Sequence, residues 1–270
     1  MNTPDHPVAI VTGASSGIGK ETAKALVAAG YRVFGTSRTP AQTEAGITML
    51  PCDVTEDASV TAMVGEVLQR TGRIDILVNN AGGALIAAAE ETSLDQAKAL
   101  FELNFFGTVR VTNAVLPTMR QQRSGRIINI SSVVGFLPSP YSAHYAATKH
   151  AIEGYSESLD HEIRTFGIRV VLVEPAFTRT ALDHNAGKPD HPLAAYEPAR
   201  QVMTAVWAEA IRMGDNPETV AATVATAASA RMPKLRYPAG KTAGRLALLR
   251  QFVPAGAFDK SLRKQMGLTG

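Results

Sequence analysis

Short apolar segments alternate along the chain with longer segments in which apolar residues recur every three to four positions. The short segments predict strands, and residues 74–78 and 170–173 are almost continuously apolar, as in strands buried on both faces. The longer segments predict helices, and Gly30, Gly72 and Gly167 stand where helices commonly end. This alternation predicts a three-layer, doubly wound α/β fold with a parallel sheet.

The predicted elements form a single domain of residues 1–270. Within it, about residues 183–231 begin with a proline-rich stretch that we expect to leave the sheet and cover a substrate, although a disordered insertion fits equally well. The predicted strands are residues 8–12, 32–36, 47–51, 74–79, 126–131, 169–174 and 235–238, and the predicted helices include 19–29, 57–71, 94–119 and 146–166.

Composition excludes several classes of protein. Hydrophobic residues make up 45% of the 270, yet no run reaches the roughly 18 apolar residues that a membrane span needs. The polar N-terminus leaves no room for a signal-peptide core. Because Cys52 is the single cysteine, we expect no internal disulfide, no metal site and a reducing, cytoplasmic setting.

Positive charge gathers at the C-terminus. Residues 231–270 contain nine of the 27 Lys and Arg residues and a single acidic residue. The basic character of the chain therefore belongs to a tail, residues 232–270. This distribution argues against nucleic-acid binding by the whole protein. Leucines and phenylalanines accompany the cations in residues 241–267, which fits peripheral membrane contact, a cover over the pocket, or a helix packed on the domain.

A glycine-rich turn joins the first predicted strand to the first predicted helix. Gly13 suits a tight turn, Gly17 allows close approach of the backbone to a pyrophosphate, and the helix N-terminus favours phosphate charge. The turn therefore predicts a dinucleotide site. Its residues are Gly13, Ser15, Ser16, Gly17, Ile18 and Gly19.

The end of the second strand indicates which dinucleotide binds. NAD sites place an acidic residue there for the ribose hydroxyls, whereas this chain has Ser37 and Arg38. Arg38 suits the 2′-phosphate of NADP, and Ser37 adds a hydroxyl. We therefore expect NADP(H); the alternative is that Arg38 is a solvated loop cation.

Tyr145 and Lys149 are four residues apart and share one face of a predicted helix. A nearby ammonium favours the phenolate, which predicts a pKa lowered from about 10 toward neutrality. Ser132 follows a predicted strand at the edge where open α/β sheets bind ligands, and its hydroxyl can hold a carbonyl oxygen against Tyr145.

Taken together, the turn, Ser132, Tyr145 and Lys149 resemble the short-chain dehydrogenase/reductase family over about residues 7–180. Residues 173–180 and the long basic C-terminus resemble members grouped with 17β-hydroxysteroid dehydrogenases and retinol reductases. The resemblance implies a Rossmann fold with seven parallel strands, and a homodimer or homotetramer formed through helices 94–119 and 146–166. It also implies a Ser132, Tyr145 and Lys149 catalytic set in which Asn104 holds a water that links the lysine to solvent.

Further cofactor contacts are implied by the same resemblance. Asp53 matches an acid near the adenine, residues 80–82 border the adenosine ribose, and the Thr178 backbone meets the nicotinamide carboxamide. Ala176 replaces a family glycine, which would cost about 1 kcal/mol if the backbone there needs a positive φ. The implied contacts are Asp53, Val54, Asn80, Ala81, Gly82, Tyr145, Lys149, Pro175, Thr178 and Thr180.

The implied activity is NADP(H)-dependent interconversion of a ketone or aldehyde with its alcohol, with Tyr145 as general acid and base. The alternative is a catalytically silent NADP(H)-sensing protein on the same fold. An apolar set favours a hydrophobic small-molecule substrate, although half of it fits the core equally well, and Trp207 is interpreted as packing or surface. This set is Val133, Val134, Phe136, Leu137, Tyr141, Phe177 and Leu182.

Overall fold

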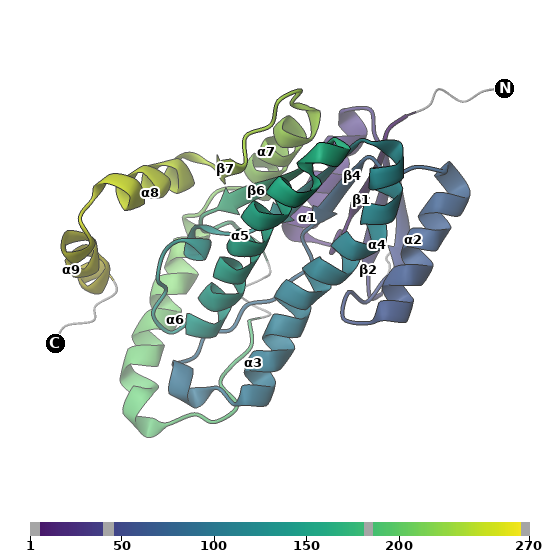
Figure 1. Cartoon of the computed structure of the whole chain (residues 1–270). Coiled ribbons are helices and arrows are strands. Elements are labelled where there is room, and N and C mark those ends of the chain that lie inside the picture. Colours follow the sequence, from purple (N-terminus) through teal and green to yellow (C-terminus); the bar gives the residue numbers. More distant parts are fainter. Residues whose placement is uncertain (1–5, 40–45, 181–185, 266–270) are drawn as a thin grey trace.

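The computed structural model describes residues 6–39, 46–180 and 186–265, so Leu182 of the apolar set lies outside the described residues. A seven-stranded sheet runs through the molecule in the order β3-β2-β1-β4-β5-β6-β7 (Figure 1). Every strand pair is parallel. The predicted doubly wound α/β fold in a single domain is confirmed.

Each predicted strand is present, and for most strands the ends differ from the prediction by one or two residues. β4 begins two residues later than predicted, although the backbone of Asp75 just before it still bonds to Val8 at 2.9 Å and to Arg126 at 2.8 Å. The strands are β1 Val8–Val11, β2 Arg32–Ser37, β3 Ile47–Pro51, β4 Ile76–Asn79, β5 Gly125–Ile130, β6 Ile168–Pro175 and β7 Arg236–Ala239.

Helices cover both faces of the sheet. On one face, side chains of α2, α4 and α5 pack on the sheet around Val115 and Ile127. On the other face, α1 and α7 pack around Leu26 and Val224. The helices are α1 Gly17–Ala28, α2 Asp57–Thr71, α3 Leu94–Phe101, α4 Gly107–Gln122, α5 Ala143–Ile163, α6 Glu197–Arg212, α7 Pro217–Ser229, α8 Lys241–Phe252 and α9 Ala255–Gln265, with short helices η1 Ala89–Glu91, η2 Glu102–Phe106, η3 Val133–Gly135, η4 Arg164–Phe166 and η5 Ala194–Tyr196.

The predicted helical stretch over residues 94–119 is present, but it is not one regular α-helix. A π-helical turn, η2, separates α3 from α4. Such a turn holds one extra residue and redirects the side chains around it, which the apolar periodicity of the sequence does not reveal. It contains Asn104, which is 1% exposed.

The predicted substrate cover divides into two parts. Residues 186–212 lie beside the loop after β4 and end in α6, which Figure 1 shows below the sheet with α3. In contrast, α7 packs on the sheet through Val220, Val224 and Ala227, so it belongs to a helical layer. The tail forms β7, then α8 and α9, which extend from one side of the body (Figure 1).

Candidate active site

The turn after β1 is a concave backbone surface made by its glycines. Gly13 and Gly17 have φ values of +65° and +53°, which disfavour any residue with a Cβ. A Cβ on Gly13 would also lie 2.9 Å from the Ala81 Cα. The Asn80 amide closes the turn by donating to the carbonyl oxygens of Thr12, at 2.9 Å, and Gly13, at 3.1 Å.

The N-terminus of α1 faces this turn without a negative charge. The Ser16 side chain makes no capping hydrogen bond, and the first turn of α1 contains no acidic residue. Its free amides and positive helix dipole are therefore suited to phosphate oxygens. Gly19 lies behind the turn, where a Cβ would be 2.2 Å from the Gly13 carbonyl oxygen, so its lack of a side chain permits close helix packing.

One cleft of about 780 Å³ runs along the carboxyl edge of the sheet, within the size range of small-molecule sites. Among the predicted catalytic and cofactor-binding residues, Gly19 and Asn104 do not line it. The predicted residues that do are Gly13, Ser15, Ser16, Gly17, Ile18, Ser37, Arg38, Asp53, Val54, Asn80, Ala81, Gly82, Ser132, Tyr145, Lys149, Pro175, Thr178 and Thr180.

At the end of β2, the polar groups fit a phosphorylated ribose. The Ser37 hydroxyl is buried and has no hydrogen-bond partner among the described residues, which is typical of a group that a ligand completes. Arg38 is exposed at the rim of the same cleft. Hydrogen bonds from the backbone and side chain of Thr55, at 3.0 and 2.7 Å, lower the pKa of Asp53 and keep it charged. These residues therefore fit a dinucleotide cofactor.

Tyr145 and Lys149 lie on one face of α5, as predicted, and both are buried. Lys149 donates to the Ile130 carbonyl oxygen at 2.8 Å, and its Nζ is 5.8 Å from the centre of the Tyr145 ring. Burial raises the pKa of Tyr145 to about 12, although a hydrogen bond with Ser132 opposes the rise. Burial lowers the pKa of Lys149 to about 8, against the opposing charge of Glu153.

The expectation that Lys149 brings the pKa of Tyr145 toward neutrality was therefore wrong for the chain alone. Loss of water around the phenol outweighs attraction to the ammonium, and the same loss weakens the charged form of the lysine. In this state the phenol is neutral and holds its proton at physiological pH.

Ser132 is placed by the short helix after β5. Its hydroxyl accepts a hydrogen bond from the Val134 N–H at 3.3 Å, as the N-cap of η3, and donates to the Pro175 carbonyl oxygen at 3.3 Å. These contacts direct the hydroxyl between β5 and β6, beside Tyr145. Ser132 and Tyr145, predicted to act together, are thus brought together by the fold.

Asn104 lies behind the cleft and supports its wall. Its amide donates to the Gly83 carbonyl oxygen and to the Thr148 hydroxyl, both at 3.0 Å, and its oxygen accepts from the Gly83 N–H at 2.8 Å. Asn104 thereby ties the loop after β4 to the helix residue next to Lys149. Its predicted role in holding a water stays a prediction.

The alanine at position 176 adds no backbone strain. Among the described residues other than glycine, positive φ values occur at Arg123 and Tyr141 and not at Ala176. The loop is instead closed by the Thr178 hydroxyl, which donates to the Ala176 carbonyl oxygen at 3.1 Å. The condition under which we expected a cost of about 1 kcal/mol is therefore absent.

The remaining part of the cleft is apolar. Val133, Val134 and Phe177 line it as expected, whereas Phe136, Leu137 and Tyr141 do not. Phe136 and Leu137 pack with residues of α8 and α9, so the core-packing alternative describes them. Tyr145 belongs to an apolar cluster against which Tyr141 and Phe177 are partly buried. The buried members of this cluster are Ala84, Leu85, Ala87, Leu100, Tyr145, Met203 and Trp207.

Trp207 is the main residue that the sequence interpretation missed. It is 7% exposed, lines the cleft and meets the Phe177 ring edge-to-face at 5.5 Å. Its helix follows a proline-rich stretch with no recognisable motif. The available signal was a lone tryptophan, a residue type that commonly serves as an apolar anchor.

Comparison with known proteins agrees with this geometry. The family model described as short chain dehydrogenase matches residues 7–191. A 3-ketodihydrosphingosine reductase of Bacteroides thetaiotaomicron is 43% identical over 178 residues, 66% of each chain. The uncharacterized oxidoreductase YusZ of Bacillus subtilis is 33% identical over 276 residues, covering 96% of this chain and 98% of the relative. A solved short-chain dehydrogenase from Streptomyces avermitilis has a TM-score of 0.77 at 34% identity and covers 98% of this chain and 96% of its own. The chain belongs to the short-chain dehydrogenase/reductase family of oxidoreductases.

Proposed function

We propose that this protein is an NADP(H)-dependent oxidoreductase that reduces a hydrophobic ketone or aldehyde to its alcohol and catalyses the reverse reaction. The observation that carries the proposal is the pairing of two hydroxyls, those of Ser132 and Tyr145, at the inner end of a cleft that begins at a glycine turn. Bound NADPH supplies the hydride for the carbonyl carbon.

The protein supplies orientation and a proton. The Ser132 hydroxyl hydrogen-bonds the carbonyl oxygen, and Tyr145 donates its proton to the same oxygen as negative charge develops there. The high pKa of the buried phenol, about 12, keeps this proton in place at neutral pH, so that it is available for donation. Lys149, anchored by the Ile130 carbonyl, places a cation near the tyrosinate that remains and near the cofactor ribose.

NADP(H) is proposed over NAD(H) because of the groups at the end of β2. The unpartnered Ser37 hydroxyl and the exposed Arg38 guanidinium offer donors for a 2′-phosphate, and β2 ends without a carboxylate to accept from ribose hydroxyls. The Gly13 and Ser16 turn would hold the pyrophosphate, and Asp53 would lie toward the adenine.

A lipid-like ketone is the proposed substrate class. The apolar wall formed by Phe177, Trp207 and Ile211 supports it, since burying a hydrocarbon chain there removes apolar surface from water. The Bacteroides relative is named as a reductase of a 3-keto compound, 3-ketodihydrosphingosine, which agrees with this choice.

The deciding experiment follows NADPH absorbance with a panel of carbonyl compounds that includes 2-decanone, menadione and a short polar aldehyde. We expect turnover with apolar members and tighter binding of NADPH than of NADH in a fluorescence titration. Tight cofactor binding without turnover of any member would favour the silent NADP(H)-sensing alternative. Tighter binding of NADH would refute the cofactor assignment.

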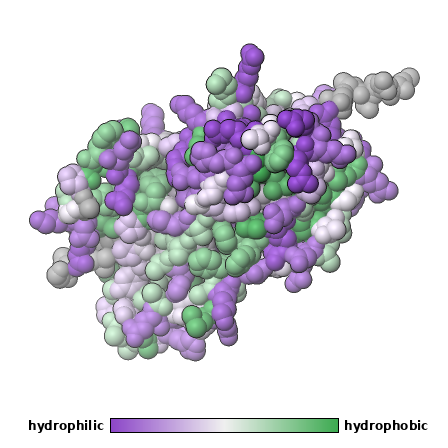
Figure 2. Space-filling model, in the orientation of Figure 1, coloured by the Kyte–Doolittle hydropathy of each residue, from purple (hydrophilic) through white to green (hydrophobic). Residues whose placement is uncertain are grey.

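We also propose a homodimer or homotetramer formed through α4 and α5. Phe106 is 48% exposed beside Phe105, which packs edge-to-face on Tyr155 of α5 at 5.9 Å. Figure 2 has a hydrophobic surface near its centre, over these helices. Light scattering after gel filtration tests the proposal, and a monomer at micromolar concentration would contradict it.

The C-terminal tail supports a further proposal, contact with an anionic membrane surface. None of the helices in the described ranges has the length and apolarity of a membrane span. However, Leu248 and Phe252 are 59% and 73% exposed on the outward face of α8, which also carries Lys241 and Arg245. Figure 2 shows hydrophobic and hydrophilic surface side by side over this region. Such a face suits the headgroup layer of anionic lipids. A cytoplasmic location is proposed because Cys52 is a free, buried thiol.

A further inference from the structure

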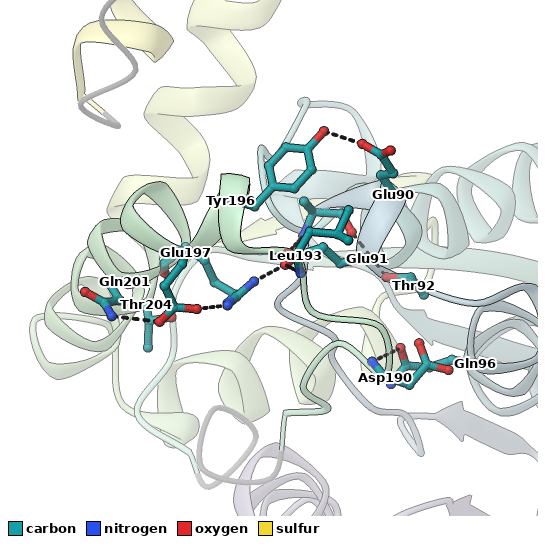
Figure 3. Close-up of polar contacts among 12 residues, drawn as sticks. Glu90, Glu91, Thr92, Gln96, Asp190, Leu193, Tyr196, Glu197, Gln201 and Thr204 are labelled. Carbon is teal, nitrogen blue, oxygen red and sulfur yellow. Dashed lines mark hydrogen bonds and ion pairs between the residues drawn. The ribbon is translucent and has the colours of Figure 1, made fainter.

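A buried carboxylate anchors the segment that covers the apolar end of the cleft. Glu91 ends the short helix η1 after β4 and is 0% exposed. Its carboxylate accepts hydrogen bonds from the Leu193 N–H at 2.9 Å and from the Ala88 N–H at 3.2 Å, and it pairs with the Arg200 guanidinium (Figure 3). One side chain therefore joins η1 to the covering segment and to α6.

The electrostatics of this contact favour a charged Glu91. Burial alone would raise its pKa, but the Leu193 N–H and the Arg200 guanidinium outweigh burial and lower the pKa. Arg200 is 15% exposed and also pairs with Glu197. Loss of the Glu91 charge would leave a mostly buried guanidinium with one carboxylate fewer, which is unfavourable.

Backbone hydrogen bonds also join these segments, from the Gly187 N–H to the Ala84 carbonyl oxygen at 2.9 Å, but the other side-chain contacts between them lie nearer the surface. The Tyr196 hydroxyl donates to Glu90 at 2.7 Å, and the Ser93 N–H donates to Asp190 at 2.9 Å (Figure 3). The two carboxylates are exposed, and Ser93 and Tyr196 are partly buried. Exposed polar contacts of this kind contribute little to stability because water competes for them. The buried Glu91 contact is therefore the main polar anchor in this set.

Arg200 connects the anchor to the cleft through helix geometry. Arg200, Met203, Trp207 and Ile211 recur every three to four residues, so they share one face of α6. Met203 and Trp207 pack in the cluster that contains Tyr145, and Trp207 and Ile211 line the cleft. The position of Arg200 thus sets how closely this wall approaches the reacting end of the cleft.

We propose that Glu91 is a positioning residue that holds α6, and with it Trp207, against the substrate end of the cleft. The role of Glu91 in substrate binding rests on the proposed function, whereas its role in placing α6 does not. Glu91 itself does not line the cleft, so it acts through Arg200 and the Leu193 backbone. Its removal should loosen the substrate wall and leave the dinucleotide end of the cleft unchanged.

Trp207 provides a direct readout, because it is the single tryptophan of the chain. In Glu91→Gln, which keeps the shape and removes the charge, we expect a red-shifted emission and quenching by acrylamide increased at least about twofold. The NADPH dissociation constant and the far-UV circular dichroism should stay unchanged. Glu90→Gln is the matched control, since Glu90 is the exposed neighbour, and it should leave emission and quenching as in the wild type.

Kinetics separate positioning from a general loss of structure. With a ketone that the wild type reduces, Glu91→Gln should raise the KM for the ketone more than it lowers kcat, with the KM for NADPH unchanged. If the wild-type protein reduces no ketone, the proposed function is refuted, and the fluorescence measurement still tests the position of Trp207.

Unchanged emission and quenching in a folded Glu91→Gln protein would overturn the inference. Should that variant fail to fold, Arg200→Met removes the other half of the contact while keeping a long side chain, and the same increase in quenching is expected. A folded Arg200→Met protein with a fully shielded Trp207, or loss of folding in both variants, would equally overturn it.

Discussion

Replacing Tyr145 by Phe removes one hydroxyl and keeps the ring, so it isolates the proton that the proposed reaction needs. The ring is 8% exposed and packs in the cluster with Leu100 and Met203, contacts that phenylalanine retains. The main structural loss is the polar contact of the phenol with the Ser132 hydroxyl, worth at most about 1 kcal/mol. For a domain of this size we expect Tm to fall by about 2–4 °C.

The effect on activity should be far larger than the effect on stability. A positioned proton donor contributes about 10²–10⁴-fold to a rate, or about 3–5 kcal/mol of transition-state stabilisation. We therefore expect kcat/KM for carbonyl reduction, followed as NADPH oxidation, to fall by that factor in Tyr145→Phe. The NADPH dissociation constant, from fluorescence titration, should change by less than about threefold, because the hydroxyl is expected to face the carbonyl oxygen.

Tyr155→Phe is the matched control for this experiment. Tyr155 lies on the same helix, and burial likewise raises its pKa to about 12, but its ring packs on Phe105 away from the cleft. We expect its kcat/KM to match the wild type. Retention of activity in Tyr145→Phe, or an equal loss in Tyr155→Phe, would refute the assignment of Tyr145 as the proton donor.

Four further outcomes test other parts of the account. Arg38→Ala should raise the NADPH dissociation constant about 10–100-fold and leave that of NADH unchanged, because one charge-assisted contact to phosphate is lost; equal effects on both would contradict the assignment. Gly13→Ala should abolish NADPH binding, since a Cβ there would meet backbone at 2.9 Å, whereas Gly72→Ala, at a similar φ of +70° with open space around it, should cost stability alone. Asp160 is buried against two arginines that help lower its pKa. The stability that this carboxylate contributes is therefore present above its unfolded pKa and is lost as pH falls through the lower folded value. In urea unfolding, Asp160→Asn should lower the free energy of unfolding by about 2 kcal/mol at pH 7 and remove that part of its dependence on pH. The full chain should co-sediment with phosphatidylserine vesicles at low salt and less so with Phe252→Ser, and absence of wild-type binding would end the membrane proposal.

Much of the fold could be predicted because it depends on residues close in sequence. Alternating apolar runs predicted each strand, and the glycines after the first strand predicted a tight turn, in which Gly13 and Gly17 have positive φ values. The spacing of Tyr145 and Lys149 predicted their shared helix face, because four residues span about one helical turn.

Other features depend on neighbours far away in the chain. The π turn at Asn104 interrupts a stretch that local periodicity predicted as helical, and its amide bonds to Gly83, 21 residues away. The partnership of Glu91 with Arg200 spans 109 residues, and neither residue carries a local sign of it.

Local pattern thus specified which elements form and which chemical groups lie at the carboxyl edge of the sheet. The protonation of Tyr145 and the wall built around Trp207 followed from packing, since both depend on how much water the assembled helices exclude. Dehydration is a property of the folded surroundings of a side chain, and spacing along a sequence carries no measure of it.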